Sequence, residues 1–409
     1  MLSVAERNLK DIDIISSEFK ANPFDFYARL RSESPVFETT MSGKIPVWLV
    51  TRYDDVKAVM MDERFVKDQN NVQGKTPLEM AWMPGFLQAL RSNMLDSDVP
   101  DHTRLKNLVH KAFTPRRIQE MQKRIAELSD MYLAAGKKKG EFDLIAEYAL
   151  PIPATVIAEI LGIPTDDIGK FHRWSNNFLQ ADFGSPISMI KMLPGVWQFV
   201  RYIRKQLQQR RQAPQDDLLT ALVEAEDNGD SLSEDEAIAM VVLLLIAGHE
   251  TTVNLIGNGT LALLQHPEQL ALLQNDPSLI GSAIEEVLRY TVPIETATER
   301  YAREDITLRG QTIPQGSLML AAIASANRDD AVFDNPNRLD ITRTPNKHLS
   351  FGHGIHYCLG APLARMEGAI ALGTLFETTP TLQLAVPANE LVWRNGMILR
   401  GLKHLPVRV

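Results

Sequence analysis

Between Met240 and Leu264 most residues are apolar or small, and the longest uninterrupted apolar run of the chain, Met240 to Gly248, begins this stretch. This pattern predicts a helix buried on nearly all sides, because it contains no continuous polar face. Ser233-Glu234-Asp235-Glu236 forms a capping box before the stretch, and His266-Pro267 ends it. The central segment Ala247-Gly248-His249-Glu250-Thr251-Thr252 places glycine and polar groups in this buried helix at a cost in stability, which indicates a functional use.

Shorter patterns elsewhere predict a mainly α-helical protein with small β-sheets (α+β). The β-rich parts are expected at approximately 36–52, 294–325 and 382–409, and helices in the remainder. Gly and Pro residues between Asp182 and Gly195 predict a break in the helices there, suited to a flexible lid. No linker, repeat or low-complexity tract divides the 409 residues, so a single domain over 1–409 is expected.

Composition and charge narrow the class of protein. With 44% hydrophobic and 23% charged residues the chain has the composition of a soluble globular protein. The first 20 residues are too polar for a signal peptide, and the run Met240 to Gly248 is too short to span a bilayer, so we expect a cytoplasmic protein without membrane insertion. The formal net charge of −8 argues against nucleic-acid binding.

The only cysteine, Cys358, lies in the glycine-rich segment from His348 to Pro362. A single cysteine excludes an intrachain disulfide and any site that needs several thiolates. Gly352, Gly354 and Gly360 allow a tight loop around the sulfur, and the helical pattern that follows would place a thiolate at a helix N-terminus. A buried cysteine without chemistry is the alternative for an isolated residue.

The motif Phe351-x-x-Gly354-x-x-x-Cys358-x-Gly360 resembles the haem-binding signature of the cytochrome P450 family, with every fixed position present. The resemblance implies the fold of that family, with the long central helix over a haem b. It also implies that Cys358 is the axial thiolate ligand of the iron, that Phe351 shields the sulfur and that His356 reaches a haem propionate.

The central segment of the long helix is similar to the oxygen-binding segment of the same family. The resemblance implies that Ala247 and Gly248 stand above the haem. Thr251 would hydrogen-bond the bound dioxygen, and Glu250 would supply protons from solvent. A helix whose polar residues are merely satisfied by hydrogen bonds is the alternative for this segment.

Three further positions align with residues that bind haem propionates in the family. Asp98-Val99-Pro100-Asp101 predicts a helix start. His102 and Lys106 follow at i and i+4, where the family has His-x-x-x-Arg. Lys106 replaces the usual arginine and loses its bidentate contact. Arg300 matches the arginine that binds a propionate, a role that suits its planar fork.

Glu286-x-x-Arg289 matches the Glu-x-x-Arg signature of the family, whose role is structural: it anchors the loop ahead of the thiolate. The resemblance implies that Arg338 is the partner of this pair. Leu339 departs from the family pattern, which has an aromatic residue after that arginine.

The resemblance covers essentially the whole chain and implies a monooxygenase. It would insert one atom of dioxygen into a C–H or C=C bond of a mainly apolar molecule, such as a polyketide, macrolide, fatty acyl chain or terpenoid.

Electrons from NAD(P)H would arrive through a separate ferredoxin or flavodoxin and its reductase, because the chain has no cysteines for a cluster. The partner would dock on basic residues near Arg104, Lys106, Lys111 and Arg116, and the enzyme is expected to be a monomer. The candidate substrate contacts are Met83, Phe86, Leu87, Phe178, Leu179, Leu243, Ile246, Ile294, Thr296, Met397 and Ile398.

Two other function classes remain open. A peroxide-driven peroxygenase or a haem isomerase would use the same thiolate with less need for Glu250 and Thr251. A non-enzymatic haem sensor would bind haem without forming a product. Turnover that depends on NAD(P)H-derived electrons would distinguish the monooxygenase from both.

Overall fold

The structure is a computed structural model that describes residues 8–41, 45–73, 90–112, 114–167, 169–170, 174, 186–227 and 230–409. The chain divides into two compact units. Unit 1 comprises Met1–Glu79, Ile125–Pro151 and Thr251–Val409, and unit 2 comprises Met80–Arg124 and Ile152–Glu250. The expectation of a single domain over residues 1–409 stays a prediction.

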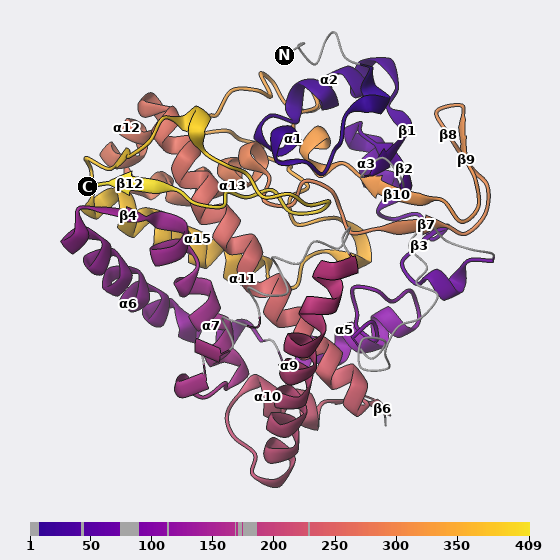
Figure 1. The fold of residues 1–409 in the computed structure, drawn as a ribbon, viewed down its shortest axis with the longest axis horizontal. Coiled ribbons are helices and arrows are strands. Elements are labelled where there is room, and N and C mark those ends of the chain that lie inside the picture. Colours follow the sequence, from indigo (N-terminus) through magenta and orange to yellow (C-terminus); the bar gives the residue numbers. More distant parts are fainter. Residues whose placement is uncertain are drawn as a thin grey trace. The chain divides into compact units, whose positions relative to one another are not determined.

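Helices dominate the chain (Figure 1). The α-helices are α1 (Ser17–Ala21), α2 (Phe24–Glu33), α3 (Tyr53–Val59), α5 (Asp101–Ala112), α6 (Pro115–Lys139), α7 (Pro151–Leu161), α9 (Pro186–Gln212), α10 (Leu218–Glu224), α11 (Glu234–Gln265), α12 (Pro267–Asn275), α13 (Ile280–Thr291), α14 (Ile323–Ala326) and α15 (Ala361–Thr378). Single turns of 3-10 or π helix are η1 (Leu9–Asp11), η2 (Gln69–Asn71), η3 (Ile145–Ala149), η4 (Thr165–Asp167), η5 (Pro277–Leu279), η6 (Gly354–His356) and η7 (Ala388–Glu390).

The strands are short and form four small sheets. They are β1 (Val36–Met41), β2 (Ile45–Val50), β3 (Phe65–Val66), β4 (Glu141–Asp143), β5 (Glu226–Asp227), β6 (Asp230–Ser231), β7 (Arg300–Ala302), β8 (Ile306–Leu308), β9 (Gln311–Ile313), β10 (Leu318–Ala321), β11 (Gln383–Leu384) and β12 (Pro406–Arg408). The orders are β1-β2-β10-β7-β3, β11-β12-β4, β5-β6 and β8-β9. This confirms the predicted class of a mainly helical protein with small sheets.

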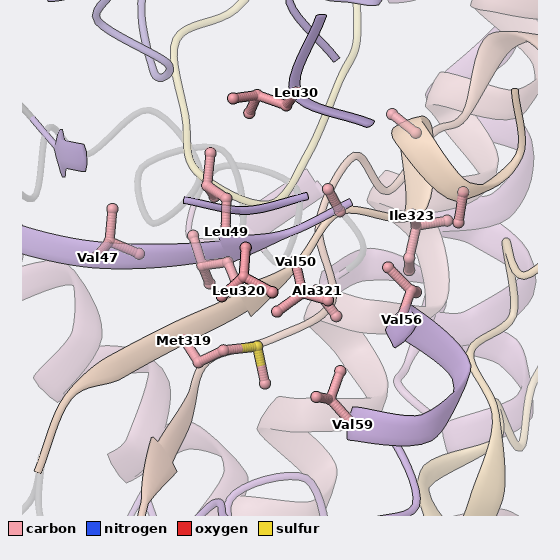
Figure 2. Close-up of a cluster of buried hydrophobic side chains, with 14 of the residues drawn as sticks. Leu30, Val47, Leu49, Val50, Val56, Val59, Met319, Leu320, Ala321 and Ile323 are labelled. Atoms are coloured by element: carbon pink, nitrogen blue, oxygen red, sulfur yellow. The ribbon is translucent and has the colours of Figure 1, made fainter. Parts of the chain in front are cut away.

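The largest sheet of unit 1 combines a local hairpin with strands that come much later in the chain. β1 and β2 pair antiparallel with Val36 opposite Val50, within the β-rich part expected at 36–52. β10 then pairs with β2 in parallel, which joins Leu320 to Leu49. Apolar side chains from this sheet, α2, α3 and α14 form a continuous core (Figure 2). The core fixes β7 and the segment before it, both of which belong to the candidate site.

Helix α11 agrees closely with the helix predicted from the apolar stretch. It runs for 32 residues, and Figure 1 shows it as one continuous helix. Its capping box is formed: the Ser233 N–H donates to Glu236 at 2.8 Å, and the Glu236 N–H donates to the Ser233 hydroxyl at 3.2 Å. α11 has the length and hydropathy of a membrane-crossing helix, yet 72% of its most apolar window is buried inside the protein.

One prediction about the helices is wrong. Pro194 and Gly195 were expected to break the helix pattern, but both lie inside α9, which continues to Gln212. Proline removes one intrahelical hydrogen bond without ending a helix whose neighbouring turns are stabilised by other contacts. Val196, Phe199 and Val200 follow directly and are buried, so packing holds the helix together after the proline.

Candidate functional site

Cys358 lies in a closed loop between the turn η6 and helix α15. The Cys358 N–H donates to the carbonyl of Phe351 at 3.0 Å, and the Ala361 N–H lies 3.4 Å from the Cys358 carbonyl oxygen. Gly354 has φ of +74°, and a Cβ there would lie 3.2 Å from the Met60 carbonyl oxygen. The loop therefore requires glycine at this position, both for its backbone conformation and for the close approach of Met60.

The thiol of Cys358 is exposed and is not part of a disulfide. It precedes the first residue of α15 by three positions, and Gly360 is the N-cap of this 18-residue helix. A helix N-terminus stabilises a nearby anion, and the anionic thiolate is the form of cysteine that binds a metal. An exposed thiolate at a helix end can bind an external metal, in contrast to the buried, unreactive cysteine that was the alternative.

An ion pair that the sequence analysis missed flanks this loop. Arg365 of α15 makes two bonds to Glu285, at 2.7 and 2.8 Å, and its guanidinium lies 4.4 Å from the centre of the Phe351 ring. His348 also reaches Glu285 at 3.1 Å. Burial disfavours the carboxylate, but the hydrogen bonds from Arg365 and His348 outweigh it and lower the pKa of Glu285 to about 2. This pair orients Phe351 beside the loop.

Glu286 and Arg289 form a fully buried ion pair on α13. The guanidinium donates to both carboxylate oxygens, at 2.7 and 2.8 Å. Arg289 also donates to the backbone carbonyls of Asn327, Pro336 and Arg338 at 2.9, 2.8 and 3.0 Å. Two ionised groups are tolerated away from water only when such bonds satisfy them.

The partner of this pair is Arg343 and not Arg338. The Arg343 side chain lies 3.1 Å from a carboxylate oxygen of Glu286, while the Arg338 side chain is exposed and only its carbonyl takes part. The prediction for Arg338 is therefore wrong. The chain after Leu339 turns back toward α13, where the Asp340 N–H donates to Glu286 at 2.9 Å. This turn brings Arg343 to the carboxylate, and no local pattern in the sequence shows it.

A chain of hydrogen bonds leads from α13 to the residues before Phe351. Arg289 holds the Asn327 carbonyl, and the Asn327 side chain donates to Ser350 and accepts from the Leu349 N–H, both at 2.8 Å. The Ser350 hydroxyl then donates to the Leu288 carbonyl at 2.7 Å. These contacts are consistent with the predicted structural role of Glu286 and Arg289, because they fix the start of the cysteine loop.

Arg300 is buried, and its terminal nitrogens donate to backbone carbonyls. The acceptors are Phe65 at 3.2 Å and Met60 at 3.3 Å. Met60 is also the residue that Gly354 approaches, so Arg300 supports the backbone beside the cysteine loop. His356 ends the turn η6 and is half-buried. The propionate-binding roles of Arg300 and His356 stay predictions.

Unit 2 holds the predicted pair on α5. His102 is buried and Lys106, one turn later, is half-buried. Much of the nearby basic cluster is already compensated within the chain. Arg104 forms ion pairs with Glu236 and Asp101, and Arg116 pairs with Glu120 at 2.8 Å. The positive charge available to a docking partner at this face is therefore smaller than the sequence suggests.

The residues of α11 differ in exposure along the central segment. Glu250 and Thr252 are buried, whereas Leu243, Ala247 and Thr251 retain exposed surface. Positions i, i+4 and i+8 lie on one side of a helix, so these three residues form a stripe of accessible surface on a helix that is otherwise largely covered. This arrangement separates an accessible hydroxyl at Thr251 from a buried carboxyl at Glu250.

Gly248 and Ile246 of α11 lie against other elements of unit 2. A Cβ at Gly248 would lie 3.2 Å from the side chain of Ile157, so glycine permits the close packing of α7 on α11. Ile246 also borders a small apolar hollow, which is lined by Leu90, Trp174, Val196, Phe199, Val242 and Leu245.

The remaining candidate substrate contacts fall into two groups. In unit 1, Ile294 forms an isolated bridge with Leu399, and the Thr296 hydroxyl donates to the Met397 carbonyl at 3.0 Å. The structure thus brings Ile294, Thr296, Met397 and Ile398 together, although they are a hundred residues apart. Met83, Phe86, Leu87, Phe178 and Leu179 lie outside the described residues.

Glu367 is a buried carboxyl on α15 that the sequence analysis did not single out. Burial raises its pKa to about 8, and the Thr252 hydroxyl on α11 opposes this rise. The folded protein therefore keeps this proton between pH 4.5 and 8, where the unfolded chain loses it, and rising pH favours unfolding over this range.

We expect Glu367→Gln to stabilise the fold increasingly as the pH rises from 5 to 8, by about 2–4 kcal/mol at pH 8, because glutamine has no proton to lose. Denaturant unfolding at three pH values measures the difference. Glu377→Gln, which changes an exposed carboxyl of the same helix, is the control. A gain that does not vary with pH would contradict the assignment of a protonated Glu367.

The residues present suit haem b. The site offers a single accessible sulfur at a helix N-terminus, which is the soft anionic ligand that haem iron accepts. Among the described residues no group of three or more His, Cys, Asp and Glu could hold a metal ion directly. The single sulfur of Cys358 fits the iron of a haem, which takes only one thiolate from the protein.

Comparison with known proteins agrees with this chemistry. The family model described as Cytochrome P450 matches residues 195–378. The chain is 43% identical over 393 residues to the polyketide biosynthesis cytochrome P450 PksS of Bacillus subtilis (strain 168), covering 95% of this chain and 96% of the relative. It is 42% identical to the cytochrome P450 monooxygenase PikC of Streptomyces venezuelae, covering 97% and 94%. The chain belongs to the cytochrome P450 family.

Solved structures extend the likeness to the fold. A structure of PksS from the bacillaene polyketide synthase of Bacillus subtilis 168 matches with a TM-score of 0.89 and 42% identity, covering 97% of this chain and 99% of that one. P450BioI, in complex with an acyl carrier protein that bears hexadec-9Z-enoic acid, matches with a TM-score of 0.85 and 40% identity, covering 96% and 100%. The fold and the class predicted from the sequence are confirmed: the chain is a cytochrome P450 monooxygenase.

Proposed function

We propose that this protein binds haem b through Cys358 and oxidises a polyketide or a long fatty acyl chain. The observation that carries the proposal is the exposed thiol of Cys358 at the N-terminus of α15, in a loop anchored to the buried pair Glu286–Arg289. When bound, haem supplies the iron at which dioxygen is reduced and one oxygen atom is transferred to carbon. His102, Arg300 and His356 would hold its propionates, with Lys106 as a further cation.

Two observations support the proposed substrate class: the names of related proteins and the apolar side chains of this chain. PksS is named for polyketide biosynthesis, and P450BioI was solved with an acyl chain on its carrier protein. In this chain Leu243 and Ala247 of α11 and the half-buried Ile294 and Met397 present accessible apolar surface. Such surfaces favour a long, mainly uncharged molecule. Insertion into a C–H or C=C bond is the reaction that we propose for it.

Electrons would come from NAD(P)H through a separate ferredoxin or flavodoxin and its reductase. The chain has a single cysteine, so it cannot hold an iron–sulfur cluster of its own.

We propose a cytoplasmic enzyme, in keeping with its bacterial relatives and with the burial of α11. The direct test is product formation from a candidate acyl or macrolide substrate with NAD(P)H and redox partners. Turnover with hydrogen peroxide alone would instead support a peroxygenase.

Glu250 and Thr251 would control the protons of this reaction. The buried carboxyl and the accessible hydroxyl occupy adjacent positions on α11, an arrangement suited to passing a proton from Glu250 toward the site.

We expect Thr251→Ala to lower the product formed per NAD(P)H consumed by about tenfold or more, because the hydroxyl that delivers the proton is lost. Substrate binding should change little. Thr251→Ser, which keeps the hydroxyl, is the matched control and should retain most of the coupling. Parallel assays of NAD(P)H consumption and product measure the effect. Equal coupling in the alanine and serine variants would remove Thr251 from the proton path.

A further inference from the structure

Unit 1 contains a buried group of charged and polar side chains that the reaction does not use. It consists of Lys20, Tyr27, Glu295 and Arg400, which we call the Glu295 cluster. Lys20 pairs with Glu295 at 3.0 Å, and the Tyr27 hydroxyl donates to the other carboxylate oxygen at 2.7 Å. Lys20, Tyr27 and Glu295 are at most 1% exposed. The cluster thus joins α1 and α2 to Glu295, which lies 268 positions after Tyr27 in the sequence.

Arg400 connects the cluster to the backbone of α1 and α13. Its guanidinium donates to the carbonyls of Lys20 and Thr291, both at 2.8 Å, and of Ala21 at 3.3 Å. It also lies 3.9 Å from the ring centre of Trp393. Each of these carbonyls is near the end of a helix, where carbonyl oxygens lack intrahelical donors, so Arg400 satisfies groups that would otherwise need water.

The charges of the cluster depend on one another. Burial lowers the pKa of Lys20, and the nearby Glu295 partly reverses this. Burial likewise raises the pKa of the Tyr27 hydroxyl, which keeps it a donor to Glu295. Removing the single carboxylate would leave the ammonium of Lys20 buried without its counter-ion, which is costly.

Glu295 lies in the segment that carries two of the candidate substrate contacts. Its N–H donates to the Ile398 carbonyl at 2.7 Å, and its carbonyl accepts from the Ala324 N–H at 2.9 Å. Next to it, Ile294 bridges Leu399 and Thr296 bonds Met397. The backbone between two candidate substrate contacts is therefore tied to the cluster through Glu295, and the opposing 397–400 segment is tied to it through Arg400.

We infer that Lys20 and Tyr27, which act through Glu295, and Arg400, which holds its own segment, are positioning residues that fix the wall formed by Ile294, Thr296 and Met397. The inference rests on the proposed function, because it gives this wall to the substrate. Apolar side chains of similar volume could provide the same stability without buried charge. A network of hydrogen bonds and ion pairs also holds the backbone in one position. This position affects how a substrate fits more than it affects the stability of the fold.

The test uses the purified haem-loaded enzyme and variants Glu295→Gln, Lys20→Met and their combination. The probe is N-dodecylimidazole, whose ring binds haem iron while its chain contacts the cavity wall; imidazole alone reports ring binding. Arg210→Met is the matched control, because it breaks a similarly buried ion pair with Asp217 in unit 2. Hydrogen exchange of the 293–299 and 396–401 segments is measured in the same samples.

We expect each single variant to weaken dodecylimidazole binding by about tenfold, leave imidazole binding unchanged and speed exchange in both segments. The double variant should lose less than the product of the two single effects, because it leaves no unpaired charge. Arg210→Met should lower thermal stability without weakening dodecylimidazole binding and without speeding exchange in the two segments. Tyr27→Phe, which removes one hydrogen bond, is the milder variant if the others do not fold, with an expected loss of about threefold.

Variants that are less stable but bind both probes and exchange like the wild type would overturn the inference. Failure of the proposed function is a different result: the wild type would then lack a thiolate-type spectrum in its reduced CO complex. In that case the exchange measurements would still show whether the cluster fixes the two segments.

Discussion

The variant Cys358→Ser should lose the thiolate-type spectrum of the reduced CO complex, and its product formation should fall below about one per cent of the wild-type rate. Serine has nearly the same shape, but its hydroxyl is not ionised at neutral pH and cannot donate electron density to iron as a thiolate does. Because Cys358 is exposed, the substitution should change the free energy of unfolding by less than about 0.5 kcal/mol. Loss of activity would therefore reflect chemistry and not folding.

Spectra of the reduced CO complex and product assays at saturating substrate measure this effect. Tyr357→Phe, at the exposed neighbouring residue, is the control and should keep both the spectrum and the activity. If Cys358→Ser retained a thiolate-type spectrum, another ligand would have to be bound to the iron. The single cysteine of this chain leaves no other thiolate, so that result would refute the site itself.

The second large effect is expected for Arg289→Met, which should lower the free energy of unfolding by about 3–5 kcal/mol. Arg289 is fully buried and makes two bonds to Glu286 and three to backbone carbonyls, which methionine cannot replace. Through Asn327 the loss extends to Ser350 and the start of the cysteine loop. The variant should therefore also retain less haem after purification.

Two control variants make this prediction specific. Arg338→Ala should change stability by less than about 0.5 kcal/mol, because only the backbone carbonyl of residue 338 contacts Arg289. Arg343→Met should cost an intermediate amount, since its side chain pairs with Glu286 at 3.1 Å near the surface. Denaturant unfolding with haem quantified in parallel measures all three. Equal losses for Arg338→Ala and Arg343→Met would contradict the observed partner of Glu286.

Several parts of the site could be predicted because their signals are local. The capping box and the apolar run specified α11 with its end at His266-Pro267, and glycine spacing around Cys358 specified a tight loop. The hairpin of β1 and β2 follows from residues close in sequence. In each case the physical cause is a hydrogen bond or a backbone angle that involves neighbouring residues, which the sequence shows directly.

Other parts could not be predicted because their causes join distant residues. The hydrogen bonds of Glu286 select Arg343, although Arg338 is equally charged and closer in sequence. Pro194 lies inside α9, although proline alone favours a break. Glu295 and Lys20 show no common pattern, yet they form a buried pair. Packing and charge compensation decide these cases after the chain has folded.

The sequence by itself determined the class of protein, the tight loop that carries Cys358 and the helix that carries Glu250 and Thr251, since each depends on residues that are close together in the sequence. Only the tertiary structure decided that Arg343 pairs with Glu286 and that burial raises the pKa of Glu367. It also decided that Lys20 forms the ion pair with Glu295. The reason is that burial and the distance between charges set those outcomes, and both exist only when separate segments pack together.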